Sequence, residues 1–350
     1  MKVLVTGSEG YIGTVLLPLF ARAGHTVSGM DIGWFRDCLL GVAEEPVGPV
    51  LRVDVRDVIP RQLEGFDAVI HLAGISNDPL GDLNPRLTYD INSGGTVHLA
   101  RMAKEAGVSR FVFSSSCSTY GAALDEELLD EWAPFRPVTC YGRSKVQAEE
   151  ALLKLADSDF TPTFARNATA YGYSPRLRGD LAVNNLVGHA VTTSSVLLRS
   201  DGRAWRPLVH VMDIARAMLA LTEAPRDLVH GRAYNVGSTE QNHRIEDVAA
   251  TVARLVPGSI VRRAHGAVPD RRNYRVNCNR LRDELGFAPQ WTLERGIEQL
   301  QTAYGDHHLT EQALSGPRFQ RVRHIQDLLA DGRLRDDLRP TVRRAAVGHV

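Results

Sequence analysis

The chain begins MKVLVTGSEGYIG (residues 1–13), an apolar run followed at once by a loop with three glycines. After this loop, apolar residues recur at helical spacing from Ile12 to Ala23. Glycines allow a tight turn and a close approach of the backbone to a ligand, and a helix N-terminus presents free N–H groups and a positive dipole end. This order of strand, loop and helix predicts a pyrophosphate site at Gly7, Gly10, Tyr11, Ile12 and Gly13.

The same alternation continues along the chain. Helical spacing covers Gly94–Ala106 and Tyr141–Ala156. Further apolar runs predict strands at Thr26–Met30, Pro49–Val53, Ala68–Leu72, Arg110–Ser114, Thr163–Arg166 and Ala233–Val236. Continuously apolar strands separated by helices indicate an α/β fold, a Rossmann-like doubly wound parallel sheet covered on both faces. In such folds ligands gather at the carboxyl ends of the strands.

After about Tyr171 the rhythm loosens into segments that contain Gly, Pro and Arg, which predicts a smaller, discontinuous lobe over the strand ends. The last part is polar and rich in Arg, with apolar positions at Ile325, Leu328 and Leu329 that predict one or two surface helices and a frayed tail. We therefore expect a dinucleotide-binding domain, a substrate-binding lobe and a C-terminal helical extension, formed by residues 1–170 plus about 205–240, about 171–204 plus 241–304, and 305–350.

Composition narrows the classes of function. The 350 residues carry 41 basic and 41 acidic side chains, and this balance argues against a nucleic-acid or anionic-membrane surface. No apolar run approaches the roughly 18 residues that cross a bilayer, and the N-terminus lacks the layout of a signal peptide. The four cysteines are widely spaced and have no clustered histidines, which predicts neither disulfides nor a metal site. We expect a cytoplasmic protein that binds a small polar ligand.

A dinucleotide is the ligand that best fits the strand ends. Asp31 ends the second predicted strand, where a carboxylate accepts ribose hydroxyls. Such a carboxylate repels a 2′-phosphate, and the nearest arginine that follows in sequence is Arg36, so we expect NAD rather than NADP. The ends of the third and fourth predicted strands suit the adenine edge and a close approach of the backbone, and they contribute Asp54, Val55, Leu72, Ala73 and Gly74.

A candidate catalytic group follows the fifth predicted strand. Tyr141 and Lys145 are four residues apart on a predicted helix and therefore share a face. A free tyrosine has a pKa of about 10, so a base at neutral pH needs a downward shift of about three units. A neighbouring ammonium and a nicotinamide cation are suited to supply it. The strand end FSSS (residues 113–116) offers hydroxyls to hold a substrate oxygen. The alternative is a tyrosine that packs on the sheet beside a solvated lysine.

The segments GSEGYIG, HLAG, NSGGT, FSSSCSTYG, YGRSK and RPLVHVMD, with Asp31 and Asp54, resemble the extended short-chain dehydrogenase/reductase family, in its nucleotide-sugar epimerase and dehydratase branch. The resemblance runs from Met1 to about Tyr304. It implies that Tyr141 is the catalytic acid/base, that Lys145 lowers its pKa and holds the nicotinamide ribose, and that Ser116 binds the reacting oxygen. It further implies NAD contacts at Asn92 and Ser114, a supporting role for Asn92 in the strand arrangement, and a homodimer formed through residues 94–106 and 141–156.

Two departures from the family pattern carry information. The 4,6-dehydratases of this family place an Asp-Glu pair directly after the catalytic hydroxyl residue, but this chain has Cys117 and Ser118. An uncharged pair does not supply that acid/base couple, which ranks 4,6-dehydration lower. Cys117 also stands one residue early relative to the catalytic cysteine of 3,5-epimerases, so we expect a small buried residue there rather than a catalytic one.

The resemblance also implies contacts to a nucleotide-diphosphate sugar, and arginine forks suit a diphosphate. Thr169 stands where galactose epimerases carry Asn, and Ala267 stands where they carry Arg. Both differences argue against UDP-galactose itself as the substrate. The implied substrate-binding residues are Ser116, Ser118, Thr169, Asn185, Leu186, Arg206, Arg271 and Arg272.

From these residues we expect an NAD-dependent nucleotide-sugar epimerase, an isomerase that acts at C4 through a transient keto sugar. An NAD(P)H-dependent keto-sugar reductase on the same scaffold is the first alternative, and a dehydratase is a weaker one. A non-catalytic Rossmann module for redox sensing is the alternative from another class, but such modules typically lose the Tyr or the Lys. The sequence does not identify the nucleotide, the sugar or the carbon that is inverted. It also leaves the role of the C-terminal extension open.

Overall fold

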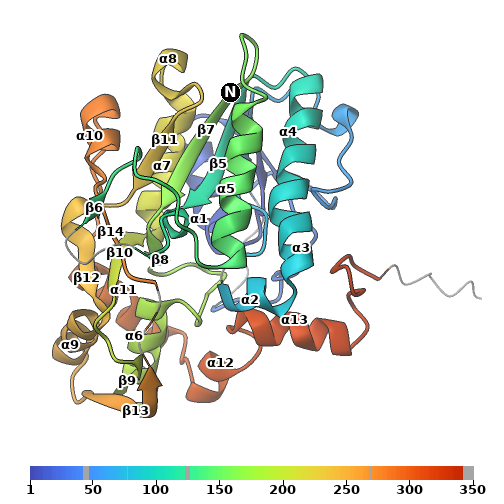
Figure 1. The fold of residues 1–350 in the computed structure, drawn as a ribbon. Coiled ribbons are helices and arrows are strands. Elements are labelled where there is room, and N and C mark those ends of the chain that lie inside the picture. Colours follow the sequence, from blue (N-terminus) through green and yellow to red (C-terminus); the bar gives the residue numbers. More distant parts are fainter. Residues whose placement is uncertain (42–46, 77, 123–126, 269, 271, 342–350) are drawn as a thin grey trace, which may run out of the picture.

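The computed structural model describes residues 1–41, 47–76, 78–122, 127–268, 270 and 272–341. Its centre is a seven-stranded parallel sheet with the strand order β11-β7-β5-β4-β1-β2-β3 (Figure 1). All seven strands coincide with the predicted apolar runs, and the Rossmann-like fold class is confirmed. The strands are β1 (Lys2–Thr6), β2 (Thr26–Met30), β3 (Val50–Leu51), β4 (Ala68–His71), β5 (Arg110–Ser116), β7 (Thr161–Asn167) and β11 (Ala233–Val236).

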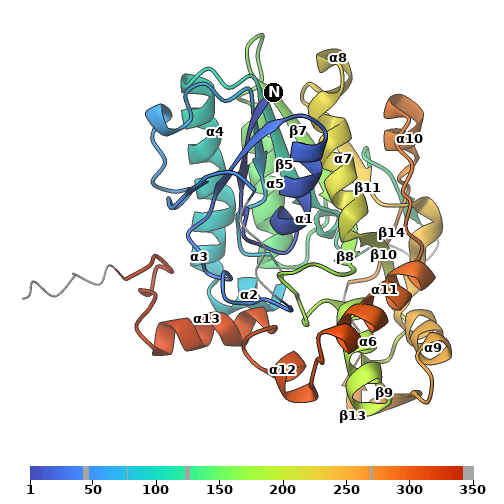
Figure 2. The ribbon, with the colours of Figure 1, turned by 180° about the vertical axis from the view of Figure 1, so that it is seen from behind.

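Helices cover both faces of this sheet, because its strands are apolar on both sides. On one face, α1 (Gly13–Arg22) and α7 (Val211–Glu223) pack together over a core that includes Phe20 and Met218. On the other face lie α4 (Thr96–Glu105) and α5 (Cys140–Leu153), with Leu99 and Leu152 in a second core (Figures 1 and 2). The sheet is thus buried from both sides, and its open part is the edge at the carboxyl ends of the strands.

The turn between β1 and α1 requires glycine at two positions. Gly7 has a φ of +70°, and a Cβ there would lie 2.8 Å from the backbone nitrogen of Ala73. A Cβ at Gly13 would lie 2.4 Å from the carbonyl oxygen of Gly7. These two glycines let the loop fold tightly against the end of β4, so the N-terminus of α1 faces the strand ends.

A smaller lobe lies beyond the strand ends and has its own apolar core. It contains a three-stranded sheet of the order β12-β10-β8 and a two-stranded sheet of β13 and β9. The expected boundary placed residues 205–240 with the dinucleotide domain. In the structure, residues 205–210 pair within the small sheet, whereas residues 211–236 return to the central sheet. The lobe contains β8 (Thr169–Tyr171), α6 (Ala182–Thr193), β9 (Ser195–Ser200), β10 (Trp205–His210), β12 (Asn242–Arg244), α9 (Ile245–Leu255), β13 (Ile260–Val268) and α11 (Leu293–Asp306).

Short elements join these layers. Two strands, β6 and β14, form a small parallel pair, and a π-helical turn, η2, lies between α3 and α4. The short elements are η1 (Pro60–Gln62), α2 (Asp78–Leu83), α3 (Pro85–Tyr89), η2 (Asp90–Gly95), η3 (Cys117–Thr119), β6 (Leu128–Leu129), α8 (Arg226–Val229), η4 (Thr239–Gln241), β14 (Arg275–Val276) and α10 (Asn279–Leu285).

The C-terminal extension forms two helices, α12 (Glu311–Ser315) and α13 (Arg321–Ala330), in agreement with the expected number. They are docked rather than free on the surface. The helix α12 packs on α6, and α13 runs beneath α2 (Figures 1 and 2). Ile325 and Leu328 are buried in one cluster with Ile75, Leu80 and Ile91. The expected frayed tail, residues 342–350, lies outside the described residues.

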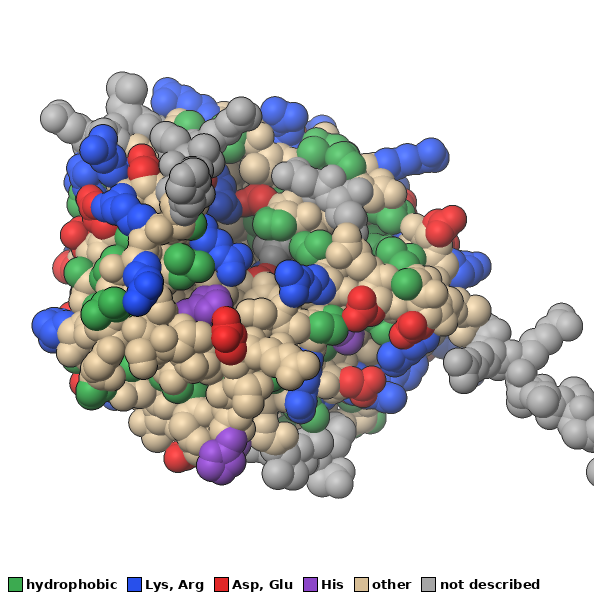
Figure 3. Space-filling model, turned by 90° about the horizontal axis from the view of Figure 1, so that it is seen from below, with side chains coloured by type: hydrophobic (Ala, Val, Ile, Leu, Met, Phe, Trp, Pro, Cys, Tyr) green, Lys and Arg blue, Asp and Glu red, His purple; other side chains and the backbone are tan. Residues whose placement is uncertain are grey.

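The surface and the cysteines complete the description. Seen from below, basic and acidic side chains are mixed over the face (Figure 3). None of the helices in the described ranges is long and apolar enough to cross a membrane. The described part of the chain shows no cluster of potential metal ligands. The four cysteines are free thiols.

Candidate active site

A cavity of about 1080 Å³ lies at the carboxyl ends of β1, β2, β4 and β5 and continues into the smaller lobe. This volume exceeds the roughly 300–1,000 Å³ of typical small-molecule pockets. The sequence placed candidate cofactor residues at these strand ends. Of those residues, the following line the cavity: Gly7, Gly10, Tyr11, Ile12, Gly13, Asp31, Asp54, Val55, Leu72, Ala73, Gly74, Ser114, Tyr141 and Lys145.

The glycine loop provides an open cradle. A Cβ at Gly10 would contact the carbonyl oxygen of Gly7 at 3.1 Å and nothing else within 4 Å, so the space above this residue is free for a ligand. The Tyr11 hydroxyl is held within the chain, because it donates a hydrogen bond to the carbonyl of Gly172 in the smaller lobe at 2.7 Å. The loop therefore combines an exposed helix N-terminus with a fixed position against the lobe, which suits a pyrophosphate.

Asp31 is placed for a ribose. Its carboxylate accepts hydrogen bonds from the backbone N–H groups of Glu9 (3.0 Å) and Gly33 (2.7 Å), and each oxygen retains a lone pair for a hydroxyl. Burial raises the pKa of Asp31, and the two backbone hydrogen bonds oppose this shift. Arg52 also lies here, but the carboxylate of Glu9 binds its guanidinium. Two acids around one neutralised arginine fit the unphosphorylated ribose of NAD.

The side chains of Asp54 and Asn92 are both held by contacts within the chain. The Asp54 carboxylate forms a two-point ion pair with Arg56, whose other nitrogen binds Asp90 at 2.9 Å. Asn92 does not line the cavity. Its amide bonds both the N–H and the carbonyl of Ile75, and it donates to the hydroxyl of Ser144 on α5. Asn92 thus holds the loop after β4 against α5, in line with the supporting role implied by the resemblance.

The candidate catalytic side chains meet at the end of β5. Ser116 ends this strand and lines the cavity together with Tyr141, near enough for its hydroxyl to lower the pKa of the phenol. The Lys145 ammonium donates to the carbonyl of Ser114 at 2.8 Å and lies 5.8 Å from the centre of the Tyr141 ring. The side chain of Thr139 caps the N-terminus of α5, which fixes the first turn that carries the tyrosine. A hydroxyl, a phenol and an ammonium therefore line one corner of the cavity.

The pKa values at this corner differ from the sequence-based expectation. Burial raises the pKa of Tyr141 to about 12, and the nearby hydroxyl of Ser116 offsets this shift only in part. Burial lowers the pKa of Lys145 to about 8, against the opposing charge of Glu149. The expected downward shift of the Tyr141 pKa is therefore not produced by the residues of the chain. Near neutral pH, these residues hold Tyr141 as a phenol beside an ammonium that is close to its own titration point.

The positions directly after Ser116 contain no acid. Cys117 is fully buried and does not line the cavity, and its thiol points to the carbonyl of Arg166 at 3.1 Å. Burial raises the pKa of this thiol well above its usual value, which is unsuited to a reactive thiolate. Ser118 does line the cavity, and its buried hydroxyl has no hydrogen-bond partner in the structure.

The expected substrate residues that can be placed lie on the far wall of the cavity. Thr169, Asn185, Leu186, Arg206 and Arg272 all line it, whereas Arg271 and the side chain of Ala267 lie outside the described residues. The arginines are not free. Arg206 and Arg272 both bind Asp270, at 2.6 and 2.9 Å, and Arg272 also binds Asp78 at 2.5 Å. Although burial opposes it, this pairing lowers the pKa of Asp270 to about 2.

Sequence reasoning missed several residues of the cavity wall. Asp78 follows β4, and its charge raises the pKa of Tyr141. Arg178 is paired with Asp180 and donates to the Ser76 hydroxyl at 3.2 Å, which links the lobe to the loop after β4. No local sequence pattern predicts that these residues line the cavity, because contacts between segments far apart in the sequence bring them there. Other missed residues follow β2 or belong to the C-terminal extension, and they include Trp34, Phe35, Gln320, Arg321, Arg323 and Gln326.

The chain is similar in sequence to a family of known enzymes. Residues 3–237 match the NAD dependent epimerase/dehydratase family. UDP-glucose 4-epimerase of Bos taurus is 27% identical over 342 residues, which cover 85% of this chain and 95% of that protein. UDP-glucuronic acid decarboxylase 2 of Arabidopsis thaliana is 23% identical over 316 residues, which cover 87% and 70%.

A solved structure gives the same indication. The structure described as MoeE5 in complex with UDP-glucuronic acid and NAD superposes with a TM-score of 0.74 at 26% identity, over 87% of this chain and 99% of that chain. The relatives thus include an epimerase and a decarboxylase, so the comparisons identify a family and leave the reaction open.

Proposed function

The chain belongs to the NAD-dependent epimerase/dehydratase family, and from this premise and the site geometry we propose that it is a nucleotide-sugar epimerase acting at C4. The observation that carries the proposal is the hydroxyl–phenol–ammonium corner formed by Ser116, Tyr141 and Lys145, with no acid directly after Ser116. This set supports one reversible oxidation of a sugar alcohol. The 27% sequence identity to UDP-glucose 4-epimerase of Bos taurus, over most of both chains, supports the same choice.

The residues of the cavity have distinct tasks in this reaction. NAD supplies a hydride acceptor and, once reduced, a hydride donor. As the sugar carbon becomes a ketone, the Tyr141 oxygen takes the hydroxyl proton and gives up its own phenol proton to the unprotonated amine of Lys145, and Ser116 is placed to hold the same sugar oxygen. The proton returns from Tyr141 when the ketone is reduced on its opposite face. One hydride and one proton leave and return, so the reaction consumes no reductant.

The far wall is suited to a nucleoside diphosphate. The arginine forks of Arg206 and Arg272 match diphosphate oxygens in geometry and charge. In the structure they hold Asp270 and Asp78, so substrate binding has to exchange these carboxylates for phosphate oxygens. Asn185 and Leu186 on α6 lie on the same wall and are proposed to contact the nucleotide. We also propose a homodimer through α4 and α5, which gel filtration with light scattering tests directly.

Asp78 favours a second candidate, a sugar-nucleotide dehydratase. Its carboxylate acts on the pKa of Tyr141, and its Oδ1 atom has no hydrogen-bond partner among the described residues. A dehydration needs a base of this kind near the ketone. The ion pair with Arg272 weakens this alternative, because it holds the other oxygen of the carboxylate away from such a role.

One experiment separates the candidates. The purified protein is incubated with NAD and a panel of nucleotide sugars without added reductant, and the products are identified by NMR and mass. An epimer of unchanged mass that retains a C4 deuterium label supports the proposal. A product lighter by one water supports the dehydratase. Turnover only with a keto sugar and NAD(P)H supports the reductase, and no turnover with any sugar supports a binding module.

A further inference from the structure

The C-terminal strap, which we define as residues 311–341, joins the two halves of the molecule. On the lobe side, Leu314 is buried against α6, and the carbonyl of Phe319 accepts a hydrogen bond from the N–H of Gly179 at 2.9 Å. On the sheet side, the Trp34 indole donates to the carbonyl of Leu338 at 3.0 Å. Between these two anchors the strap lines part of the cavity, and its helix α13 runs beneath α2 (Figure 1).

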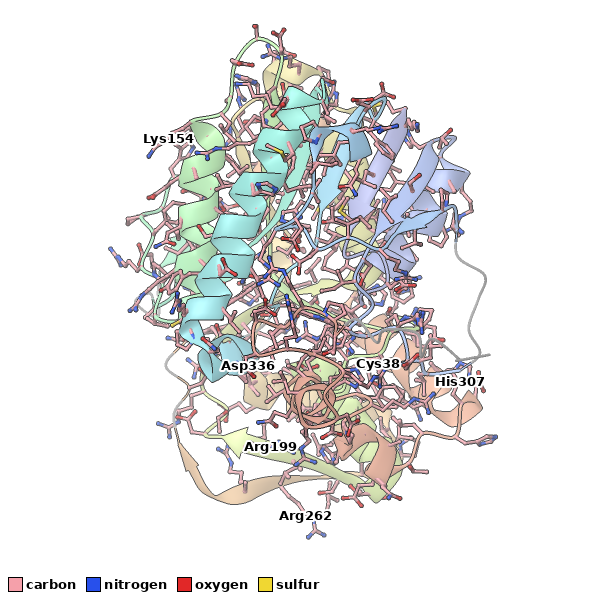
Figure 4. The ribbon with its side chains drawn as sticks, turned by 90° about the vertical axis from the view of Figure 1, so that its right-hand side faces the viewer. Cys38, Lys154, Arg199, Arg262, His307 and Asp336 are labelled. Carbon is pink, nitrogen blue, oxygen red and sulfur yellow. The ribbon has the colours of Figure 1, made fainter. Side chains whose placement is uncertain are left out.

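Further contacts secure the sheet-side anchor. The ring of His324 bonds the Trp34 carbonyl at 2.7 Å, and Arg339 forms a two-point ion pair with Asp57 at 2.8 and 2.9 Å. Cys38, which follows Trp34 along the chain, lies where the two halves meet, whereas Arg262 points outward at the far end of the lobe (Figure 4). The sheet-side anchor thus binds Trp34 in the segment that follows β2, and Asp31 lies at the end of that strand.

The strap contributes six residues to the cavity wall: Ser315, Gln320, Arg321, Val322, Arg323 and Gln326. Arg321 is distinctive because it is only 2% exposed. Its guanidinium stacks 4.0 Å from the centre of the Phe35 ring, and its Nη2 atom donates to the carbonyl of Arg176 at 3.3 Å. Its Nη1 atom is buried and has no hydrogen-bond partner in the part of the chain that the structure describes.

A buried guanidinium with an unused donor is costly, and proteins normally pair such charges. None of the ion pairs in the described ranges involves Arg321, although Asp180, which is paired with Arg178, contributes a favourable charge nearby. Burial lowers the pKa of Arg321 to about 10, which leaves it positively charged at neutral pH. Arg178 is neutralised by Asp180, whereas Arg176 and Arg321 each keep a buried Nη1 atom without a hydrogen-bond partner among the described residues, so these two donors favour an anion.

The position of Arg321 selects which anion. Phe35, on which it stacks, follows Asp31 at the ribose end of the cofactor side. Arg176, whose carbonyl it binds, donates to the carbonyl of Glu9 in the glycine loop. The other arginine group, Arg206 with Arg272, is held by Asp270 and Asp78 on the substrate side. Arg321 is therefore tied to the cofactor half of the cavity.

We propose that Arg321 binds the pyrophosphate of the dinucleotide and that the C-terminal strap closes the cofactor half of the cavity over it. The pyrophosphate then lies between the N-terminus of α1 and the guanidinium of Arg321. A strap anchored on both halves has to loosen before the dinucleotide leaves, so release is slow. This inference depends on the NAD of the family and not on the proposed epimerisation.

The test measures cofactor release without turnover. Full-length protein is loaded with NADH and mixed with excess NAD, and the loss of NADH fluorescence gives the release rate. Arg321→Gln removes a charge-assisted hydrogen bond, so we expect NADH affinity to fall by about 10- to 100-fold, with most of the change in the release rate. Arg318→Gln is the matched control, because Arg318 lies exposed on the same strap outside the cavity wall, and it should change release by less than about twofold.

Two further measurements keep the proposal open to refutation. Arg321→Lys retains the charge and should restore part of the NADH affinity. Wild-type protein digested with trypsin should be cut more slowly at Arg321 and Arg323 when NADH is present, with no change at the exposed Arg282 of α10. This digestion decides the question even where Arg321→Gln does not fold.

Unchanged NADH release in a folded Arg321→Gln protein would overturn the proposal. So would a loss of UDP affinity with NADH affinity intact, since it would assign Arg321 to the substrate. Failure of the proposed function is distinguishable: a protein that turns over no sugar but retains NADH through Arg321 contradicts the epimerase and supports the strap.

Discussion

The two walls of the cavity are built on different principles. The sheet-side wall carries Ser116, Tyr141 and Lys145, each at a strand end or in the first turns of the helix that follows. The lobe-side wall is assembled from ion pairs between distant segments, such as Asp78 with Arg272. The first wall is fixed by the local order of the chain, and the second by tertiary packing. The chemistry thus lies on the wall that local structure determines, whereas substrate selection is left to the wall that packing determines.

The sharpest way to break this comparison is to remove the phenol of the sheet-side wall. Tyr141→Phe should lower turnover by about 10²- to 10⁴-fold, because the Tyr141 phenol is the group proposed to exchange a proton with the sugar hydroxyl. NADH affinity should stay within about twofold. Steady-state turnover and NADH titration check both expectations.

Tyr173→Phe is the matched control, since Tyr173 lies outside this cavity wall and should leave turnover nearly unchanged. Turnover of Tyr141→Phe within about threefold of wild type would contradict the assignment of Tyr141 as the acid/base.

The same contrast explains what the sequence predicted. The seven strands, the glycine loop and Asp31 follow from local patterns, because period and turn chemistry are properties of neighbouring residues. The raised pKa of Tyr141 was not predictable, since it depends on how deeply packing buries the phenol. The strap was expected as surface helices because its apolar positions reveal a buried stripe but not its partner. Ile325 finds that partner in Ile75 and Ile91, more than two hundred residues earlier.

A second prediction concerns the support behind the sheet-side wall. Glu149 and Arg166 form an ion pair at 2.8 Å, only 4% and 6% exposed, and the Ser115 hydroxyl also binds Glu149. Removing one partner leaves a buried charge uncompensated, so Glu149→Gln should lower the free energy of unfolding by about 3 kcal/mol. Urea unfolding measures the change.

The neighbouring Glu150 is exposed, and Glu150→Gln should change the free energy of unfolding by less than about 0.5 kcal/mol. Equal effects of the two substitutions would show that the buried pair does not support the catalytic corner.

A third prediction tests the lobe-side wall. Arg272→Gln removes one diphosphate fork, so we expect KM for the nucleotide sugar to rise by about 10- to 30-fold while kcat changes little. Arg282→Gln, on the exposed surface of α10, should leave both constants unchanged. A fall in kcat with constant KM would instead assign Arg272 a role in catalysis. The two walls would then not have separate functions.

The smallest effect is a pH dependence that belongs to the sheet-side wall alone. Burial raises the pKa of Tyr141 to about 12 and lowers that of Lys145 to about 8. Below about pH 8 the pair holds both protons and has no place for the proton of the sugar hydroxyl. Above it Lys145 has lost its proton, and its neutral amine is able to take up the phenol proton that Tyr141 releases when it receives the proton of the sugar hydroxyl. We therefore expect kcat/KM to rise by about tenfold per pH unit up to about 8 and then to level off.

The buried histidines do not produce this limb, because burial lowers the pKa of His71 to about 3 and that of His210 to about 4. Glu149→Gln removes the charge that raises the Lys145 pKa, so in this variant the limb should move to lower pH. The measurement is kcat/KM from pH 6 to 10, with circular dichroism to confirm folding at each point. A fall in kcat/KM above pH 8 would instead mean that the reaction requires the doubly protonated pair. A limb that does not move in Glu149→Gln would assign it to a group on the lobe-side wall.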